Sequence, residues 1–222
     1  MIKVVIFDFD GVLVESLDIK TNAFARLFQE EGPEAVKIVV GYHLNNSGVS
    51  RFEKFKYIYK NILKRQLKED IFKRLCREFS SLVKEEVINA SFVPGAWEFL
   101  NKFSGQYNCY VISATPQKEL EGIIAAKEMK HYFKAVFGAP DEKTEAAKRI
   151  ITREKISSDE GVYIGDALSD YRAAKANGIN FIARICGNEV LFAGLDCLRK
   201  PDLLGLEGDL KILGLACVNK AR

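Results

Sequence analysis

The chain opens with a short hydrophobic run and then changes to a different spacing of apolar residues. Residues 4–7 are all apolar, and an acidic pair and a glycine follow them at once. Such a run predicts a buried strand, and its unbroken apolarity is typical of a parallel sheet covered on both faces. From Asp18 to about Val87 the apolar residues instead recur at helical spacing, so we expect helices and no strand there.

Two helices are particularly clear in this stretch. Ser50 and Glu53 form a capping box at the start of the first one, which carries an apolar stripe to Leu63. The second carries a stripe between residues 71 and 82. Residues 36–42 fit a helix or a strand, and we favour a helix. Together the stripes predict the core of a small helical bundle.

Strand-like and helix-like runs alternate after Pro94. We expect strands at 109–112, 135–137, 161–164 and 179–183, and helices at 97–103, 119–127, 142–154 and 169–177. This alternation predicts a parallel sheet with crossover helices.

The first strand must join this sheet, which divides the chain into two parts. Residues 15–90 are a helical insertion into a core made of residues 1–14 and 91–222. The fold class is therefore α/β, a parallel sheet core with an inserted α-helical unit. Near the end of the chain we expect a last strand at 203–204 and a helical turn at 210–213.

Composition narrows the class of protein. The 222 residues suffice for a sizeable core, and 48% hydrophobic with 28% charged residues is typical of a soluble globular protein. A net charge of +3 gives no argument for nucleic acid, and no apolar run is long enough to span a membrane. With no secretion signal and five scattered cysteines, we expect a cytoplasmic protein with reduced thiols. The sequence does not fix the oligomeric state, and we favour a monomer.

Acidic residues follow two of the predicted strands. Asp8 ends the first strand and Asp10 lies two residues on, so their carboxylates repel unless a cation or a shared proton lies between them. Asp166 and Asp170 follow a later strand, four residues apart on one face of a helix start. With Asp8 they form a set of hard oxygen ligands suited to Mg²⁺. The alternative is that these residues are solvated turn and helix-start acids.

Four motifs in order resemble those of the haloacid dehalogenase-like superfamily. They are DFDGV at 8–12, Ser113 in CYVISATP, Lys143 in GAPDEKTEA, and GDALSD at 165–170. The helical insertion directly after the first strand resembles the phosphoglycolate phosphatase and β-phosphoglucomutase branch. The resemblance implies a Rossmann-like core and a cap domain that closes over the carboxyl edge of the sheet.

The resemblance also implies a role for the acidic motifs. Asp8 is expected to be the nucleophile and Asp10 the general acid and base. Mg²⁺ is expected to bind Asp8, the Asp10 carbonyl, Asp166 and Asp170, the last directly or through water. Dehalogenating relatives lack an acid at the position of Asp10, so its presence favours phosphate chemistry.

The other two motifs are expected to bind phosphate. The Ser113 hydroxyl and nearby backbone N–H groups, including that of Ala114, would hold phosphate oxygens. Many relatives carry Asn where Ala114 stands, so a side-chain contact from this position is not expected. Lys143 would pair with the phosphate and screen Asp8; the alternative is an ordinary surface lysine on a helix.

The insertion is rich in basic residues. Residues 51–77 hold ten Lys or Arg against three acids, and most are expected to form a solvated face. Near the loop that precedes this segment, Arg51 and Lys54 are the candidates for contact with an anionic substrate. His43 is a further candidate, although a solvated loop histidine is simpler. A nucleic-acid face lacks the aromatic pattern that stacking on bases requires.

These observations predict a Mg²⁺-dependent phosphatase that acts on a small phosphorylated metabolite. The chain has no nucleotide-binding glycine motif, and its two histidines exclude a histidine metal cluster. A phosphosugar mutase uses the same four motifs and stays open as an alternative. So does a catalytically inactive binding protein of this fold, although retention of Asp8 and Asp10 argues against it.

Overall fold

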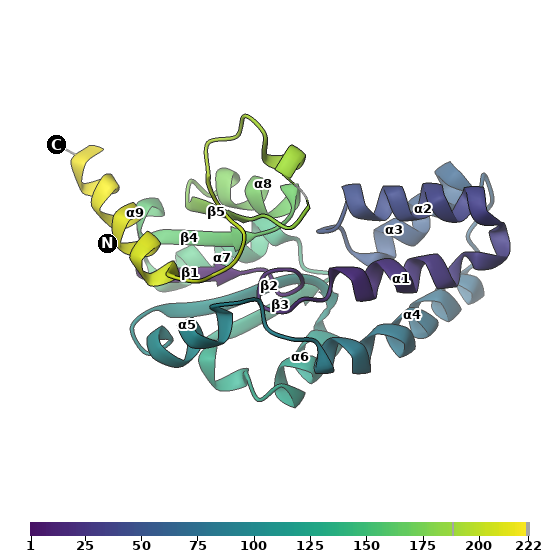
Figure 1. Cartoon of the computed structure of the whole chain (residues 1–222), viewed down its shortest axis with the longest axis horizontal. Coiled ribbons are helices and arrows are strands. Elements are labelled where there is room, and N and C mark those ends of the chain that lie inside the picture. The colour runs from purple at the N-terminus through teal and green to yellow at the C-terminus, as the bar shows by residue number, and fades with distance from the viewer. Residues whose placement is uncertain (188, 221–222) are drawn as a thin grey trace.

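Within the described residues, six parallel strands form one sheet in the order β3-β2-β1-β4-β5-β6 (Figure 1). The structure is a computed structural model that describes residues 1–187 and 189–220. The strands are β1 Val4–Phe7, β2 Asn108–Pro116, β3 Ala135–Ala139, β4 Gly161–Gly165, β5 Asn180–Arg184 and β6 Leu198–Lys200. The predicted α/β class is confirmed.

The strand β1 lies at the centre of this sheet, and both of its faces are covered. Val4 pairs with Asn108 of β2 on one side and with Gly161 of β4 on the other. Side chains alternate along a strand, so Val4 and Ile6 pack into one apolar cluster while Val5 and Phe7 pack into the other. This two-sided burial explains the unbroken apolar run at the start of the sequence.

In the part of the chain that the structure describes, five helices cover the two faces of the sheet. The helices α7 (Lys143–Glu154) and α8 (Leu168–Ala176) pack on the face of Val4. The opposite face carries α5 (Ala96–Phe103), α6 (Gln117–Ala126) and α9 (Leu206–Lys220). The core is therefore a three-layer arrangement, as crossover helices between parallel strands require.

The helices between residues 17 and 89 pack together beside the sheet, and we call residues 15–90 the helical block. It contains α1 (Leu17–Leu27), α2 (Pro33–Asn45), α3 (Arg51–Tyr57), a π-helical turn (Ile58–Ile62) and α4 (Glu69–Asn89). Figure 1 shows it beyond one end of the strands. Its interior is aromatic: the ring of Phe24 lies 5.6 Å from that of Phe55 and 4.9 Å from that of Phe79, measured between ring centroids.

The block is joined to the core by two neighbouring segments. The Glu15 N–H donates a hydrogen bond to the Ser91 carbonyl at 2.9 Å, and the Val93 N–H donates to the Leu13 carbonyl at 3.1 Å. The chain thus leaves and re-enters the core at one place. Because β1 and β2 lie side by side, the insertion interrupts the sequence without interrupting the sheet.

The end of the chain differs from the prediction. The last strand is β6 at Leu198–Lys200, so a strand at 203–204 is wrong, and the turn at 210–213 belongs to the longer α9. Leu203 is instead a loop residue buried in the apolar cluster of the sheet face that α9 covers. Its N–H donates to the Pro94 carbonyl at 2.8 Å, and its backbone packs against Gly95. Leu198 and Arg199 of the edge strand β6 are exposed. This strand therefore has no apolar run from which it could be predicted.

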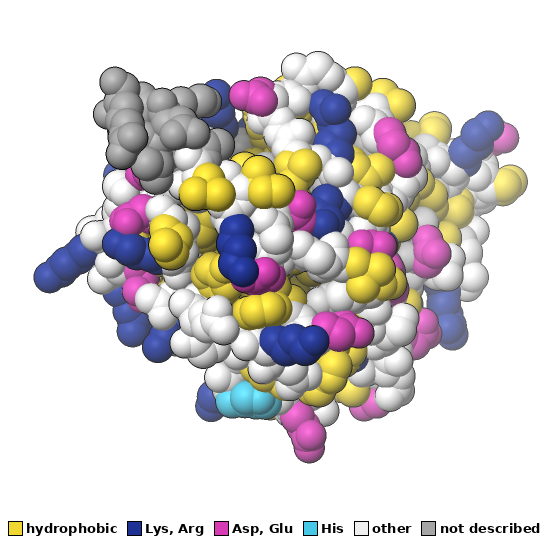
Figure 2. Space-filling view, turned by 60° about the vertical axis from the view of Figure 1, so that its left-hand side comes forward, with side chains coloured by type: hydrophobic (Ala, Val, Ile, Leu, Met, Phe, Trp, Pro, Cys, Tyr) yellow, Lys and Arg dark blue, Asp and Glu magenta, His cyan; other side chains and the backbone are white. Residues whose placement is uncertain are grey.

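The surface of the core is mixed in charge. On the face shown in Figure 2, acidic and basic side chains are interspersed with apolar ones. None of the helices within the described ranges combines the length and apolarity that crossing a bilayer demands.

Candidate active site

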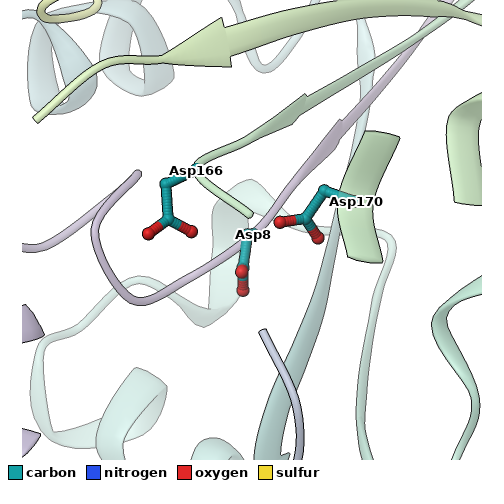
Figure 3. A group of neighbouring side chains, drawn as sticks. All are labelled: Asp8, Asp166 and Asp170. Atoms are coloured by element: carbon teal, nitrogen blue, oxygen red, sulfur yellow. The ribbon is translucent and has the colours of Figure 1, made fainter. Parts of the chain in front are cut away.

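Three buried carboxylates meet at the carboxyl edge of the sheet. Asp8 directly follows β1, Asp166 follows β4, and Asp170 lies in the first turn of α8. One oxygen of each lies within 4.8 Å of the others, and Figure 3 shows the three side chains close together, with Asp8 between Asp166 and Asp170. The parallel sheet produces this cluster, because adjacent parallel strands end at the same edge.

Lys143, the first residue of α7, joins two of these carboxylates. Its Nζ lies 2.8 Å from Asp8 Oδ2 and 2.7 Å from Asp170 Oδ1. Asp170 Oδ2 also accepts a hydrogen bond from the Ala167 N–H at 3.2 Å. At Gly165 a Cβ atom would come within 2.2 Å of the Asp170 Cβ, so only glycine allows this close approach.

Lys143 pairs directly with Asp8 and Asp170, and its one positive charge does not balance the negative charges of the three carboxylates. Burial, and after it the charge of Asp170, raise the pKa of Asp8 to about 7 against the attraction of Lys143. Burial and the charge of Asp8 likewise raise the pKa of Asp166 well above its usual range. Burial opposes the charge of Lys143, but Asp170 and Asp8 keep its pKa above normal. A divalent cation would relieve this repulsion, and the all-oxygen donor set fits Mg²⁺.

Asp10 lies in the same site but has different partners. Its Oδ1 accepts from Ser16 Oγ at 2.7 Å, and its Oδ2 accepts from Thr115 Oγ1 at 3.0 Å and Ser113 Oγ at 3.2 Å. Lys20 Nζ pairs with Oδ2 at 2.5 Å. Burial disfavours the charged form, yet the Lys20 ammonium and these hydrogen bonds hold the pKa of Asp10 below its usual value. The Asp10 carboxylate is therefore ionised at neutral pH in this arrangement.

Lys20 and Thr115 are site residues that the sequence analysis did not identify. Thr115 could have been identified from the sequence, because it stands two residues after Ser113 and alternation places both side chains on one face of β2. No sequence feature marked Lys20 as a site residue, since a lysine in the first turns of a helix is common. Its Nζ also bonds Thr115 Oγ1 at 2.9 Å, so α1 contacts the core at the carboxyl edge.

A cavity of about 30 Å³ lies between these carboxylates and the helical block. Asp8, Asp10, Asp166, Ala114 and Thr115 line it from the core. The block lines the other side with Leu17, Lys20, Phe24, His43, Ser47, Val49, Arg51, Lys54 and Phe79. This volume holds about two water molecules, so a larger ligand requires the block and the core to move apart.

Arg51 stands at the start of α3, as predicted, but it does not point to water. Its guanidinium pairs with the Glu119 carboxylate of α6, with N–O distances of 3.0 and 2.5 Å, and donates to Ser80 Oγ at 2.8 Å. A cation at the start of a helix is unfavourable unless an anion compensates its charge. The core itself supplies that anion through Glu119.

Lys54 and His43 are also buried together. Lys54 Nζ lies 2.9 Å from His43 Nδ1 and 3.3 Å from the Ser47 carbonyl. The interpretation of His43 as a solvated loop residue is wrong, because α2 continues to Asn45 and the ring stacks on Phe24 at 4.5 Å. Burial and the nearby Lys54 charge lower the pKa of His43 to about 2, so the imidazole is neutral.

One loop of the block touches the segment that carries the acidic cluster. The Gly48 carbonyl accepts a hydrogen bond from Ser169 Oγ at 3.2 Å. A Cβ atom on Gly48 would lie 2.8 Å from the Ala167 Cβ and closer still to Ser169 Oγ. This contact requires glycine for its small size.

Comparison with known proteins gives a consistent result. A family model described as haloacid dehalogenase-like hydrolase matches residues 5–184. A phosphorylated carbohydrates phosphatase from Thermotoga maritima is 26% identical over 217 residues, which cover 90% of this chain and 95% of that protein.

Solved structures share the fold over nearly the whole chain. The crystal structure of CbbY from Rhodobacter sphaeroides in complex with phosphate has a TM-score of 0.73 at 17% identity, over 93% of this chain and 96% of that one. A structure described as a predicted phosphoglycolate phosphatase from Haemophilus somnus has a TM-score of 0.72 at 19% identity, over 93% and 97%.

Proposed function

The chain belongs to the haloacid dehalogenase-like hydrolase family, and on this basis we propose that it is a Mg²⁺-dependent phosphatase acting on a small phosphomonoester. The observation that carries the proposal is the buried cluster of Asp8, Lys143, Asp166 and Asp170 beside Asp10. The curated relative named for phosphorylated carbohydrates supports the same class of substrate.

Asp8 is the proposed nucleophile. Its carboxylate attacks phosphorus, the bond from phosphorus to the leaving oxygen breaks, and an aspartyl-phosphate forms. Lys143 holds Asp8 Oδ2 at 2.8 Å, and the Phe9 N–H holds Oδ1 at 2.6 Å, so the carboxylate is fixed in orientation before substrate arrives. A bound Mg²⁺ held by Asp8, Asp166 and Asp170 would offset the negative charge of the phosphoryl oxygens.

Asp10 is the proposed acid and base. It protonates the leaving alkoxide in the first step, then takes a proton from the water that attacks phosphorus and releases phosphate from Asp8. The ion pair with Lys20 favours the ionised form that the second step needs. For the first step Asp10 must hold a proton, so we expect Lys20 to move from Asp10 to the phosphoryl oxygens when substrate binds.

The remaining predicted residues have supporting roles in this scheme. Ser113 Oγ lies 3.2 Å from Asp10 Oδ2, and Ala114 lines the same cavity, so the Ser113 hydroxyl and the Ala114 N–H would donate to the phosphoryl oxygens. The helical block 15–90 would act as a cap over the core of residues 1–14 and 91–222. Its side of the cavity contains Arg51, Lys54 and His43, and substrate selection would come from there.

The direct test is release of inorganic phosphate from p-nitrophenyl phosphate and from a panel of phosphorylated metabolites, with Mg²⁺ and with chelator. We expect metal-dependent release, and its absence from every substrate would overturn the proposal. Product analysis separates the mutase alternative, because a mutase returns the phosphoryl group to the sugar whereas a phosphatase transfers it to water.

A further inference from the structure

Lys54 is a buried cation on the wall of the cavity, and its partners are neutral. Lys54 is 1% exposed. Among the described residues, its Nζ forms hydrogen bonds only with His43 Nδ1 and the Ser47 carbonyl. The other cations in or beside the cavity each pair with a carboxylate of the chain: Lys20 with Asp10, Arg51 with Glu119, and Lys143 with Asp8 and Asp170.

The Lys54 ammonium is therefore incompletely compensated. An ammonium has three N–H donors, and the described residues supply two acceptors. The Phe24 ring, 5.5 Å from Nζ, adds a weak cation–π contact. Burial and the nearby Lys20 charge lower the pKa of Lys54 well below its ordinary value, and the more distant Asp166 and Asp10 carboxylates offset this only in part. An unpaired buried charge is costly, and an anion placed in the cavity would remove that cost.

The surroundings of Lys54 keep it directed at the cavity. The His43 ring is held by its stack on Phe24, and its Nδ1 must accept because an ammonium only donates. Arg51 is not equivalent, since Glu119 and Ser80 already occupy its guanidinium. Among the described cations of the block that line the cavity, Lys54 is thus the one with no carboxylate within hydrogen-bond distance.

We infer that Lys54 binds a second anionic group of the substrate, on the part that leaves when the phosphate is removed. The substrate class is then a phosphomonoester that also carries a carboxylate or a second phosphate. This inference rests on the proposed function, because the first phosphate is taken to lie at Asp8. It assigns specificity to the charge of the leaving group.

The test measures binding, so that it does not depend on turnover. Asp8→Asn and the double variant Asp8→Asn/Lys54→Met are titrated calorimetrically with matched ligands in the presence of Mg²⁺. One pair is 3-phosphoglycerate and glycerol 3-phosphate, which differ by a carboxylate. The other is fructose 1,6-bisphosphate and fructose 6-phosphate, which differ by a phosphate. The two pairs distinguish the two kinds of second anion.

We expect Asp8→Asn to bind at least one ligand with a second anionic group about 10- to 100-fold more tightly than the matched ligand without it, as a charge-assisted contact provides. Lys54→Met should remove that preference and leave the affinity for the ligand without the second anionic group within about threefold. The control is Lys56→Met in the same background, since Lys56 lies two residues away with its side chain 60% exposed, and it should preserve the preference.

Two outcomes overturn the inference. One is that neither ligand with a second anionic group binds more tightly than its match without that group. The other is that Lys54→Met weakens the binding of both members of a pair equally. Hydrolysis of p-nitrophenyl phosphate by the unmodified protein tests the proposed function separately. Failure there removes the phosphatase assignment, while the binding comparison still decides the role of Lys54.

Discussion

Arg51 of α3 and Glu119 of α6 form a two-point ion pair between the helical block and the core. The Arg51 side chain is 4% exposed and that of Glu119 is 10% exposed. Ser80 of α4 donates to the same carboxylate at 2.6 Å, and the guanidinium lies 4.4 Å from the centre of the Phe79 ring. Because the pair is buried and shared by three helices, it holds the block against the core beside the cavity.

Removing one member of this pair should destabilise the protein. Glu119→Gln or Arg51→Met leaves a buried charge without its partner, and we expect the free energy of unfolding to fall by about 3 kcal/mol. The double variant should cost less than the sum of the two, because no unpaired charge then remains. Urea unfolding measures all three. The control is Glu78→Gln, whose ion pair with Arg74 is exposed and should contribute at most about 1 kcal/mol. Single variants no worse than this control would show that the pair is not structural.

Asp8→Asn should abolish turnover without unfolding the protein. The amide keeps the size of the side chain but cannot attack phosphorus. Because the pKa of Asp8 is raised by burial, the neutral amide should leave the thermal midpoint unchanged or higher. Asp141→Asn is the matched control, an exposed aspartate that pairs with Arg149. Near-normal turnover by folded Asp8→Asn would exclude Asp8 as the nucleophile.

Asp10→Asn should discriminate between leaving groups. General acid catalysis typically contributes about 10²- to 10⁴-fold, and it matters most where the leaving alkoxide is strongly basic. We therefore expect a large loss of kcat for alkyl phosphates and a smaller loss for p-nitrophenyl phosphate. The ratio of the two losses is the measured quantity. Equal losses on both substrates would argue against proton transfer by Asp10.

Turnover should require Mg²⁺, and Ca²⁺ should inhibit it. Mg²⁺ binds oxygen ligands at short distance in near-octahedral geometry, whereas Ca²⁺ takes more ligands at longer range and would misplace Asp8. Mg²⁺ should also raise the thermal midpoint, because it binds the folded carboxylate cluster. Asp170→Asn should reduce this rise. Full activity after exhaustive chelation would contradict the metal site.

His43 should make the protein less stable as the pH falls below 6.5. Its pKa is lowered to about 2 in the folded state, whereas an unfolded histidine takes up a proton near pH 6.5. The unfolded state therefore binds an additional proton at this residue, so His43 alone lowers the free energy of unfolding by about 1 kcal/mol between pH 6.5 and 5.5. Asp8, whose pKa burial raises to about 7 in the folded state, contributes with the opposite sign over the same range, so the His43 effect is measured as the difference from a variant that lacks the histidine.

Urea unfolding at pH 7.5 and 5.5 tests this effect. His43→Asn, which keeps an acceptor for Lys54, should lose less stability on acidification than the unmodified protein. The exposed His131 provides the control through His131→Asn, which should follow the unmodified protein. An identical pH dependence in His43→Asn would contradict the prediction.

The sequence predicted the sheet and its acidic edge because both depend on local patterns. Buried strands carry continuous apolar runs, and Asp8, Asp166 and Asp170 are defined by their positions just after two of them. Parallel pairing alone then brings them together. The strand β6 was missed because its exposed side chains carry no such pattern.

The missed parts of the site depend on contacts between distant segments. Lys20 reaches Thr115 over 95 positions of sequence, and Arg51 reaches Glu119 over 68. In both pairs, the sequence around one residue gives no indication of which distant residue it will contact. The burial of His43 likewise follows from how α1 and α2 pack, which periodicity does not specify. The angle at which the helices meet the core decides which polar residues face the cavity.

The two neighbouring segments that connect the block to the core also affect the order in which the protein folds. Val4 of β1 must find Asn108 of β2 across the whole length of the block, and closing so long a loop is entropically costly and slow. If the bundle forms first, the hydrogen bond between Glu15 and Ser91 replaces that long loop by a short connection. The favoured order is then local helical assembly followed by closure of the central strands. Mutations that loosen the bundle should therefore delay formation of a sheet that they do not touch.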